Sequence, residues 1–264
     1  MCRAFRLAVG QSPAGLSTTQ ARLDWLAGQL PDIAAAQTDL LLLPELFATG
    51  YNISDQVRAR AEPSDGPIAN TLSGLARQHG LAIHYGYPEE AEGVLYNAAQ
   101  CFGPDGALLG GYRKRAIPPG FERDYFTAGQ DAQLFTYRGV RIGTLICYDA
   151  EFPELVRQTT SLGAELVLVP TALGAQWEWV ARQMIPTRAY ENGVYLAYAN
   201  SAGAENGLRF LGQSFVAAPD GQEIVRAQAL PQIIYATLDP NKVTAAQKRL
   251  PYLVDRQAFM HDLN

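Results

Sequence analysis

The chain has 264 residues, of which 48% are hydrophobic and 18% are charged. A chain of this length buries roughly three quarters of its unfolded surface, so it needs no disulfide or metal staple. The formal net charge of -5 disfavours a nucleic-acid partner, because phosphate binding depends on clustered Lys and Arg. We therefore expect a small-molecule ligand.

Cysteine and histidine usage excludes two further classes of protein. The three cysteines are odd in number and widely spaced, which argues against a disulfide framework and favours a reducing compartment. The three histidines, His79, His84 and His261, have no Cys or carboxylate at metal-ligand spacing around them. We therefore expect no metal site and no cofactor.

The sequence also gives no sign of export or of membrane attachment. Its first ten residues, MCRAFRLAVG, place charges inside the apolar stretch, unlike a secretory signal peptide. No run approaches the roughly eighteen apolar residues that a membrane helix requires. The sequence therefore predicts a cytoplasmic protein with no membrane partner.

The first half of the chain predicts a β-α-β-α-β-β succession. Its first helix is amphipathic, with Leu23, Leu26, Leu30 and Ile33 at helical spacing, and its second strand is a short apolar run that suits burial on both faces. The last two strands flank a Gly-Pro-Asp-Gly turn, which is a hairpin signal. The predicted elements are strands at 5–10, 39–43 and 81–87, helices at 18–36 and 68–79, and a hairpin of 95–102 and 107–114.

The second half predicts the same succession, again ending in a hairpin with a Pro-Asp-Gly turn. Its elements are strands at 140–147, 165–169 and 194–200, helices at 153–162 and 177–190, and a hairpin of 213–217 and 223–227.

Two halves of this kind each supply a sheet with helices on one side, and both sheets are buried when they pack face to face. We predict an α/β fold, a four-layer α-β-β-α sandwich. No Gly/Ser-rich or Pro-rich linker separates the halves, so we expect a single domain over residues 1–264. The tail from about residue 240 is expected to pack on the body or on a partner subunit.

Cys147 is the first candidate for a reacting group. It closes an apolar strand and opens a turn into a helix, which is the geometry that presents a nucleophile at the edge of a sheet. The alternative is that it is a small buried apolar side chain, as free cysteines usually are, and we interpret Cys2 and Cys101 in that way. Cys147 differs from them in the polar residues that follow it.

Three further positions suit hydrolysis through a thiol. Glu45 follows the apolar run LLLLP, where desolvation raises the pKa of a carboxyl and makes it a base near neutral pH, although a helix N-terminal carboxylate is the alternative. Lys114 ends a hairpin strand and, with the backbone N–H of Tyr148, can stabilise an oxyanion; most such lysines are exposed and idle. Glu122 is the third, with a surface pair to Arg123 as its alternative.

Three ordered segments carry a recognisable pattern: Leu-Pro-Glu at 43–45, Tyr-Arg-Lys at 112–114 and Ile-Cys-Tyr-Asp-Ala-Glu-Phe-Pro-Glu at 146–154. In these and in further segments up to residue 221 the chain resembles the nitrilase superfamily of carbon-nitrogen hydrolases. The resemblance implies the α-β-β-α sandwich, assembled as a homodimer or larger oligomer. It departs after the lysine, where many members have Lys-x-His-Leu and this chain has Lys-Arg-Ala-Ile.

The resemblance further implies a Glu-Lys-Cys triad at Glu45, Lys114 and Cys147, with an additional active-site glutamate at Glu122. In the reaction it implies, Cys147 attacks an amide while Glu45 takes the thiol proton, and Lys114 and the Tyr148 N–H hold the oxyanion. Ammonia leaves, and water activated by Glu45 then releases the carboxylic acid from a thioester. Glu122 would orient Lys114 or the substrate nitrogen.

The residues after the cysteine indicate which bond is attacked. Cys-Tyr-Asp resembles the aliphatic-amidase branch, whereas true nitrilases tend to have Cys-Trp-Glu or Cys-Gly-Glu, so we favour a small-molecule amide as substrate. Tyr51 and Trp177 are candidates for substrate contacts, with ordinary aromatic packing as the alternative. The other hypotheses are an N-carbamoyl amine hydrolase, a nitrilase, a non-enzymatic binding member of the fold, and a Cys-His hydrolase that uses His79 or His84.

Overall fold

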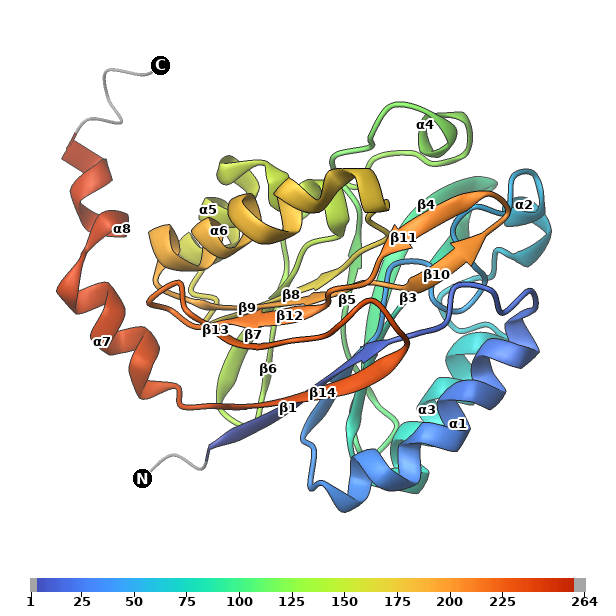
Figure 1. The fold of residues 1–264 in the computed structure, drawn as a ribbon, viewed down its shortest axis with the longest axis horizontal. Coiled ribbons are helices and arrows are strands. Elements are labelled where there is room, and N and C mark those ends of the chain that lie inside the picture. Colours follow the sequence, from blue (N-terminus) through green and yellow to red (C-terminus); the bar gives the residue numbers. More distant parts are fainter. Residues whose placement is uncertain (1–3, 259–264) are drawn as a thin grey trace.

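Two six-stranded sheets form the centre of the protein in a computed structural model that describes residues 4–258 (Figure 1). In the first sheet, three parallel strands are flanked by antiparallel neighbours. In order across the sheet, its strands are β14 (Gln232–Leu238), β1 (Phe5–Gln11), β2 (Leu40–Leu42), β3 (Ala82–Ala91), β4 (Val94–Phe102) and β5 (Leu108–Arg113).

The second sheet repeats this arrangement of three parallel strands with antiparallel neighbours. Its strands, in order, are β13 (Glu223–Arg226), β12 (Phe215–Ala217), β9 (Tyr195–Ala199), β8 (Leu166–Pro170), β7 (Val140–Thr144) and β6 (Leu134–Tyr137). A separate two-stranded hairpin consists of β10 (Ala202–Glu205) and β11 (Leu208–Leu211).

Helices cover the outer face of each sheet, α1 and α3 on the first and α5 and α6 on the second (Figure 1). The predicted four-layer α-β-β-α sandwich is therefore confirmed. The α-helices are α1 (Thr19–Ala35), α2 (Gln56–Arg60), α3 (Pro67–His79), α4 (Phe121–Tyr125), α5 (Pro153–Ser161), α6 (Ile185–Asn192), α7 (Asn241–Arg249) and α8 (Tyr252–Asp255). Short 3-10 segments span η1 (Cys147–Glu151), η2 (Ala175–Trp177) and η4 (Arg256–Ala258), and η3 (Val180–Met184) is a π-helical turn.

Strand β2 illustrates why the central strands are apolar throughout. Leu40 and Leu42 contact the core between the two sheets, whereas Leu41 and Leu43 contact the layer of α1 and α3. A strand that is buried on both faces has no position for a polar residue, so its sequence loses the alternation of a half-buried strand. The short apolar run predicted here is confirmed as a strand.

Four strands were not predicted from the sequence: β6, β14 and the two strands of the β10–β11 hairpin. Of these, β6 and β14 each lie at an edge of a six-stranded sheet. β14 pairs antiparallel with β1, from Phe5 opposite Leu238 to Gln11 opposite Gln232, and so brings the end of the chain into the first sheet. β6 pairs with β7 in the second sheet. In β14, buried Ile234, Ala236 and Leu238 alternate with more exposed residues, which is a signal that sequence reading can use.

The helix predicted over 177–190 is interrupted in the structure. Residues of η3 form a π-helical turn in which the Ile185 N–H donates to the Val180 oxygen, and α6 then continues through Asn192. Pro186 lies at the start of α6 and has no N–H to donate. A proline at this place removes one bond of the helical ladder, which favours a local change of helical pitch.

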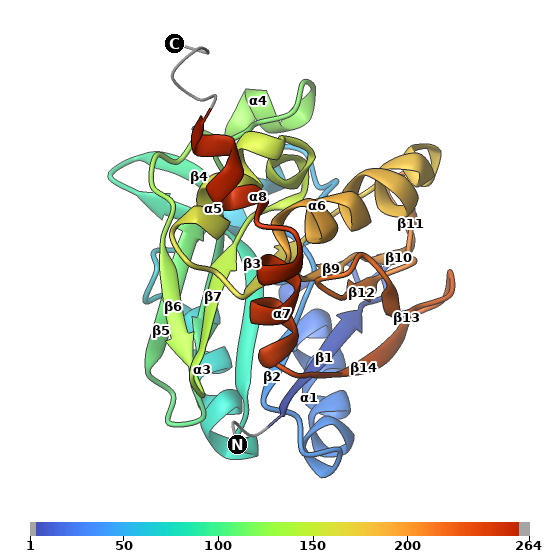
Figure 2. The ribbon, with the colours of Figure 1, turned by 90° about the vertical axis from the view of Figure 1, so that its left-hand side faces the viewer.

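The segment after β14 runs along the end of the molecule to the α5–α6 layer (Figure 2). Val243 of α7 is 3% exposed and belongs to the main core, and the Gln247 side chain donates to the Asn192 oxygen. Tyr252 of α8 lies near Tyr190 of α6, with ring centroids 6.5 Å apart. Within residues 4–258 no helix has both the length and the apolar character needed to cross a bilayer. Cys2 and His261 lie outside the described residues.

Candidate active site

Glu45 lies in a tight turn that follows β2 and presses against β3. The Ala48 N–H donates to the Gly86 oxygen at 3.1 Å, and Leu46 has a φ of +47°. A Cβ on Gly86 would lie 2.5 Å from the Leu46 nitrogen and 2.9 Å from the Pro44 oxygen, so only glycine permits this approach. The turn thereby holds the Glu45 side chain, 2% exposed, inside the protein.

Lys114 follows β5 and points its ammonium into the same interior region. Its backbone N–H donates to the Asn97 oxygen at 2.8 Å, which continues the pairing of β4 with β5. The Lys114 Nζ donates to Glu45 Oε1 at 2.7 Å and to the two oxygens of Glu122 at 2.7 and 2.8 Å. All three side chains are almost completely buried, so this is an ion cluster shielded from water.

Asn97 completes the cluster from the neighbouring strand β4. Its Nδ2 donates to Glu45 Oε1 at 2.7 Å and to Glu122 Oε2 at 3.0 Å. Glu122, in the short helix α4, also accepts a hydrogen bond from the Tyr51 hydroxyl at 2.7 Å. The two carboxylates are therefore held by one ammonium, one amide and one phenol, and Glu122 pairs with Lys114 rather than with Arg123.

Cys147 stands at the sharp bend between β7 and α5. Its φ of +46° is left-handed, a conformation that a side chain other than glycine adopts only under local constraint. Asp149, fully buried, supplies that constraint by accepting hydrogen bonds from the Ile146 N–H and the Tyr112 hydroxyl, both at 3.0 Å. It also accepts from the backbone N–H groups of Arg115 and Ala116, and so ties the cysteine turn to the segment after Lys114.

The electrostatics of the cluster suit proton transfer near neutral pH. Burial raises the pKa of Glu45 to about 7, even though Lys114 opposes the shift. Burial and the charge of Glu45 raise the pKa of Cys147 well above that of a free thiol. Burial alone would lower the pKa of Lys114, but Glu122 and Glu45 outweigh it and the pKa is raised. The resting site thus combines a neutral thiol, a fixed ammonium and a carboxyl that titrates near neutral pH.

One oxygen of Glu45 is left available. Glu45 Oε1 accepts from Lys114 and Asn97, whereas Glu45 Oε2 is buried and has no hydrogen-bond partner among the described residues. Buried carboxylate oxygens are normally paired, and unpaired ones are found where a group awaits a ligand or a proton. Burial and the Glu45 charge raise the pKa of Cys147, whereas the Lys114 charge lowers it. The thiol therefore responds to both charges.

A cavity of about 490 Å³ opens over Cys147, and its walls are mainly apolar. Both residues proposed for substrate contact line it: Tyr51, whose hydroxyl is bonded to Glu122, and Trp177, which is 57% exposed at its rim. Tyr148 also lines it, and its backbone N–H belongs to the first turn of η1, where helical N–H groups lack helical acceptors. Tyr51, Cys147, Tyr148 and Trp177 thus line one cavity, and Tyr51 joins it to Glu122, which shares the Lys114 ammonium with Glu45.

Several residues of this site were missed by sequence reasoning. Asn97 and Asp149 hold the cluster and the cysteine turn, Thr171 acts on the thiol by a hydrogen bond, and Glu151 lines the cavity. A signal existed for Asn97, because asparagine is disfavoured inside strands and here stands in a run of buried strand residues. No comparable signal marks Asp149, whose four partners come from two separate segments, residues 112–116 and Ile146.

Neither histidine within the described residues serves the cysteine. The His84 Nε2 shares a hydrogen bond with Thr144 Oγ1 at 2.9 Å, and burial lowers the pKa of His84 to about 3. His79 ends α3 in the outer helical layer. Within residues 4–258, no group of three His, Cys, Asp or Glu side chains is placed to hold a metal ion.

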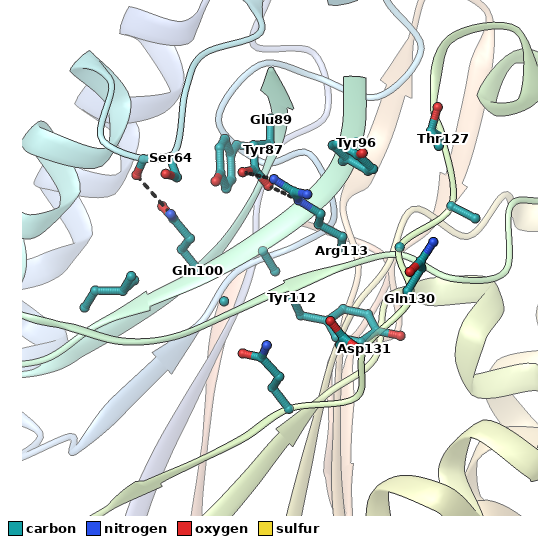
Figure 3. A pocket seen from close by; sticks show the side chains of 16 residues that line it. Ser64, Tyr87, Glu89, Tyr96, Gln100, Tyr112, Arg113, Thr127, Gln130 and Asp131 are labelled. Atoms are coloured by element: carbon teal, nitrogen blue, oxygen red, sulfur yellow. Dashed lines mark hydrogen bonds and ion pairs between the residues drawn. The ribbon is translucent and has the colours of Figure 1, made fainter. Parts of the chain in front are cut away.

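A second cavity, of about 580 Å³, lies on the outer side of β3, β4 and β5 (Figure 3). Its most prominent cation, Arg113, is already engaged, because it donates twice to Glu89 and stacks 3.9 Å from the ring centroid of Tyr96. The Gln100 amide donates to the Ser64 oxygen. Cys147 and Tyr51 line the other cavity and not this one, so we place the chemistry in the cavity over Cys147.

The fold and the site together define a class of protein: an α-β-β-α sandwich with a thiol, an ammonium and a carboxylate at adjoining strand ends. Comparison with known sequences agrees with this class. The carbon-nitrogen hydrolase family matches residues 6–248 of the chain. The chain therefore belongs to the carbon-nitrogen hydrolase family, that is, to the nitrilase superfamily, and is an amidase-like hydrolase.

Individual relatives sharpen the comparison. A protein named "Hydrolase in pqqF 5'region" from Pseudomonas protegens is 43% identical over 231 residues, which cover 86% of this chain and 81% of the relative. An (R)-stereoselective amidase from Pseudomonas sp. is 35% identical over 227 residues, which cover 86% and 82%. A solved amidase from Nesterenkonia sp. superposes with a TM-score of 0.85 at 32% identity, over 99% of this chain and 97% of that one. A variant of the Nesterenkonia sp. AN1 amidase has been solved in complex with butyramide.

Proposed function

We propose that this protein hydrolyses a small amide to a carboxylic acid and ammonia through a thioester on Cys147. The observation that carries the proposal is the unpaired, buried Oε2 of Glu45, a carboxyl whose pKa of about 7 suits it to accept and return protons near neutral pH. The similarity to amidases, one of them solved with butyramide, supports an amide as the bond attacked.

In the first half of the reaction, the Cys147 sulfur attacks the amide carbon while Glu45 Oε2 takes the thiol proton. The thiol is neutral at rest because its pKa is raised, so a base is required at the moment of attack. The carbonyl electron pair moves to oxygen, where Lys114 Nζ and the Tyr148 N–H stabilise it. The oxyanion then collapses, the carbon–nitrogen bond breaks, and the proton held by Glu45 leaves with ammonia.

In the second half, water attacks the thioester and Glu45 takes its proton. The carbon–sulfur bond breaks, the sulfur recovers the proton, and the carboxylic acid leaves. Glu122 acts on Lys114 throughout: its two oxygens hold the ammonium at 2.7 and 2.8 Å and help to raise its pKa, so Lys114 stays charged in the buried site. A fixed, charged donor needs no reorganisation when the oxyanion forms.

Ammonia release tests the reaction class. The purified protein is incubated with small amides, the corresponding nitriles and N-carbamoyl amines, and the same panel is repeated with Cys147→Ala, Glu45→Gln and Lys114→Ala. We expect amides to react best and each variant to lose at least about a thousandfold in kcat/KM. Cys101→Ala is the matched control, because Cys101 is equally buried but lies in the core away from the cavity. Full activity of Cys147→Ala would refute the proposal.

A second measurement tests the thioester itself. Hydroxylamine added during turnover attacks a thioester to give a hydroxamic acid, and intact-protein mass spectrometry of a rapidly quenched reaction detects the acyl group on Cys147. Turnover of amides with neither product would contradict a covalent intermediate. Carbon dioxide released with ammonia would instead identify a carbamoyl substrate, and faster turnover of nitriles than of amides would identify a nitrilase.

A further inference from the structure

The cavity over Cys147 contains one charged side chain that the proposed reaction does not use. Of the described residues that line it, Glu151 is the only acidic or basic residue; the others are Tyr51, Pro118, Pro119, Cys147, Tyr148, Ala172, Leu173, Gly174, Gln176, Trp177 and Leu208. A carboxylate among apolar walls is costly unless a partner offsets its desolvation. Its presence therefore calls for an explanation.

The carboxylate stands close to the reacting atoms. Cys147 and Glu151 are the first and last residues of η1, and a 3-10 helix rises by about 2 Å per residue, so their Cα atoms are about 8 Å apart. The charge of Glu151 raises the pKa of the buried Tyr198, and the charge of Lys114 lowers that of Glu151. Glu151 also lines the same cavity as Cys147, which places its side chain on the side of the turn that faces the site.

No side chain in residues 4–258 forms a recorded ion pair or hydrogen bond with this carboxylate. The two nearest cations are committed elsewhere. Lys114 is held by Glu45 and Glu122, and Arg188 pairs with Glu191 at 3.0 Å while it donates to the backbone oxygen of Glu151. Burial raises the pKa of Glu151, which is the shift expected when a carboxylate is partly desolvated without a counter-ion.

We propose that Glu151 binds a protonated amine on the acyl part of the substrate, so that the preferred substrates are amides of amino acids with apolar side chains. The inference rests on the proposed amide hydrolysis. With the amide carbon at Cys147 and the ammonium at Glu151, the apolar side chain lies against Leu173, Trp177 and Leu208. The α-carbon of such a substrate carries three groups with different contacts: the amide, the ammonium and the apolar side chain. This arrangement distinguishes the two enantiomers, so one of them reacts faster.

The same arrangement rejects substrates that carry a carboxylate. The ion cluster has two carboxylates and one ammonium, and Glu151 adds a further negative charge beside the reacting carbon. Like charges at short range in a partly buried site repel. We therefore expect amides with a free carboxylate to be poorer substrates than neutral amides of equal size.

The test compares leucinamide with 2,4-dimethylpentanamide, in which a methyl group replaces the ammonium. Measured at pH 7, where an α-amine is mostly protonated, the ratio of their kcat/KM values should favour leucinamide about tenfold to a hundredfold. In Glu151→Gln the ratio should fall to near one. Both enantiomers of leucinamide are measured, and the ratio of their kcat/KM values should also become smaller in Glu151→Gln.

Glu154→Gln is the matched control, because Glu154 lies three residues further on, is exposed and does not line the cavity. Its ratio should remain that of the unaltered protein. Hydrolysis of both amides with a ratio near one, or a ratio unchanged in Glu151→Gln, would overturn the role of Glu151 while leaving amide hydrolysis intact. Hydrolysis of neither amide, nor of any other amide in the panel, would instead count against the proposed function.

Discussion

Two buried ion clusters within residues 4–258 differ in their balance of charge. The reaction cluster, defined as Glu45, Lys114, Glu122 and Asn97, places one cation between two carboxylates. The clamp pair, defined as Arg22 and Glu205, joins one cation to one carboxylate at 2.6 Å. Both are almost completely buried, but their roles differ.

The clamp pair holds backbone. Arg22, in α1, also donates to the Ala14 oxygen, and Glu205, in the β10–β11 hairpin, accepts from the N–H groups of Tyr51 and Asn52 at 2.9 and 2.6 Å. Its charges cancel and its hydrogen bonds are directed to fixed main-chain groups. Such a pair fastens the segment that carries Tyr51, which in turn reaches Glu122 in the reaction cluster.

The reaction cluster holds a proton acceptor. Two carboxylates share one ammonium, so the second negative charge is not compensated, and burial together with Glu122 raises the pKa of Glu45 to about 7 despite Lys114. A buried pair with balanced charges stabilises a geometry. A cluster with one excess carboxylate also raises the proton affinity of that carboxylate. The comparison yields four predictions, from the largest expected effect to the smallest.

Replacing the shared cation should have the largest effect. Lys114→Met removes the ammonium but keeps the length of the side chain, and it leaves two buried carboxylates without a counter-ion. We expect kcat/KM to fall at least about a thousandfold and the free energy of unfolding to fall by about 3–5 kcal/mol, measured by urea denaturation. Activity within tenfold of the unaltered protein would show that the cluster is structural only, like the clamp pair.

Moving Glu45 without changing its chemistry should have the next largest effect. Gly86→Ala places a Cβ 2.5 Å from the Leu46 nitrogen, so the turn that carries Glu45 must shift. We expect kcat/KM to fall about a hundredfold, because small misplacements of a reacting group are costly. Gly111→Ala in β5 is the matched control, since its Cβ would approach no atom closer than 3.7 Å. Equal losses in the two variants would argue against a positioning effect.

The acid limb of the pH profile should report Glu45. A base must be ionised to accept the thiol proton, and the pKa of Glu45 is raised to about 7. We therefore expect kcat/KM to be constant well above pH 7 and to fall about tenfold per unit as the pH drops below it. The check is the pH dependence of kcat/KM between pH 5 and pH 9; a midpoint near 4.5, the ordinary value of a glutamate, would contradict the assignment.

Breaking the clamp pair should affect stability more than activity. Glu205→Gln leaves the buried Arg22 without a charged partner, and we expect the free energy of unfolding to fall by about 3 kcal/mol. The change in kcat/KM should stay below about tenfold, because the clamp pair acts on the reaction cluster indirectly, through the segment that carries Tyr51. Urea denaturation and steady-state kinetics on the same preparation measure both. A loss of activity as large as that of Lys114→Met would erase the difference between the two clusters.

Much of the fold could be predicted because each central strand has a recognisable local sequence pattern. Apolar runs such as the one at β2 follow from burial on both faces, and the Pro-Asp-Gly turns follow from the positive φ that Gly106 and Gly221 adopt. β14 was missed because it follows the whole second half of the chain and returns to pair with β1 in the first sheet. Its partner strand is therefore far away in the sequence. The expected single domain and homo-oligomer stay predictions.

The chain by itself determined which residues we propose to carry chemistry. Glu45, Lys114 and Cys147 each follow a strand, and the order of their motifs led to the family that sequence comparison assigns. The sequence also placed Cys147 at a bend between a strand and a helix, and the structure has a left-handed φ of +46° at that bend.

Only the tertiary structure decided how those residues act. It pairs Lys114 with two carboxylates, leaves one oxygen of Glu45 free, and turns Glu151 toward the cavity. Asn97, Asp149 and the clamp pair join segments that are far apart in the chain, so no local pattern identifies the partners of these residues. Charge balance and burial are properties of what surrounds a group in space, and for that reason the raised pKa of Glu45 follows from the packing of the two sheets and not from the local sequence.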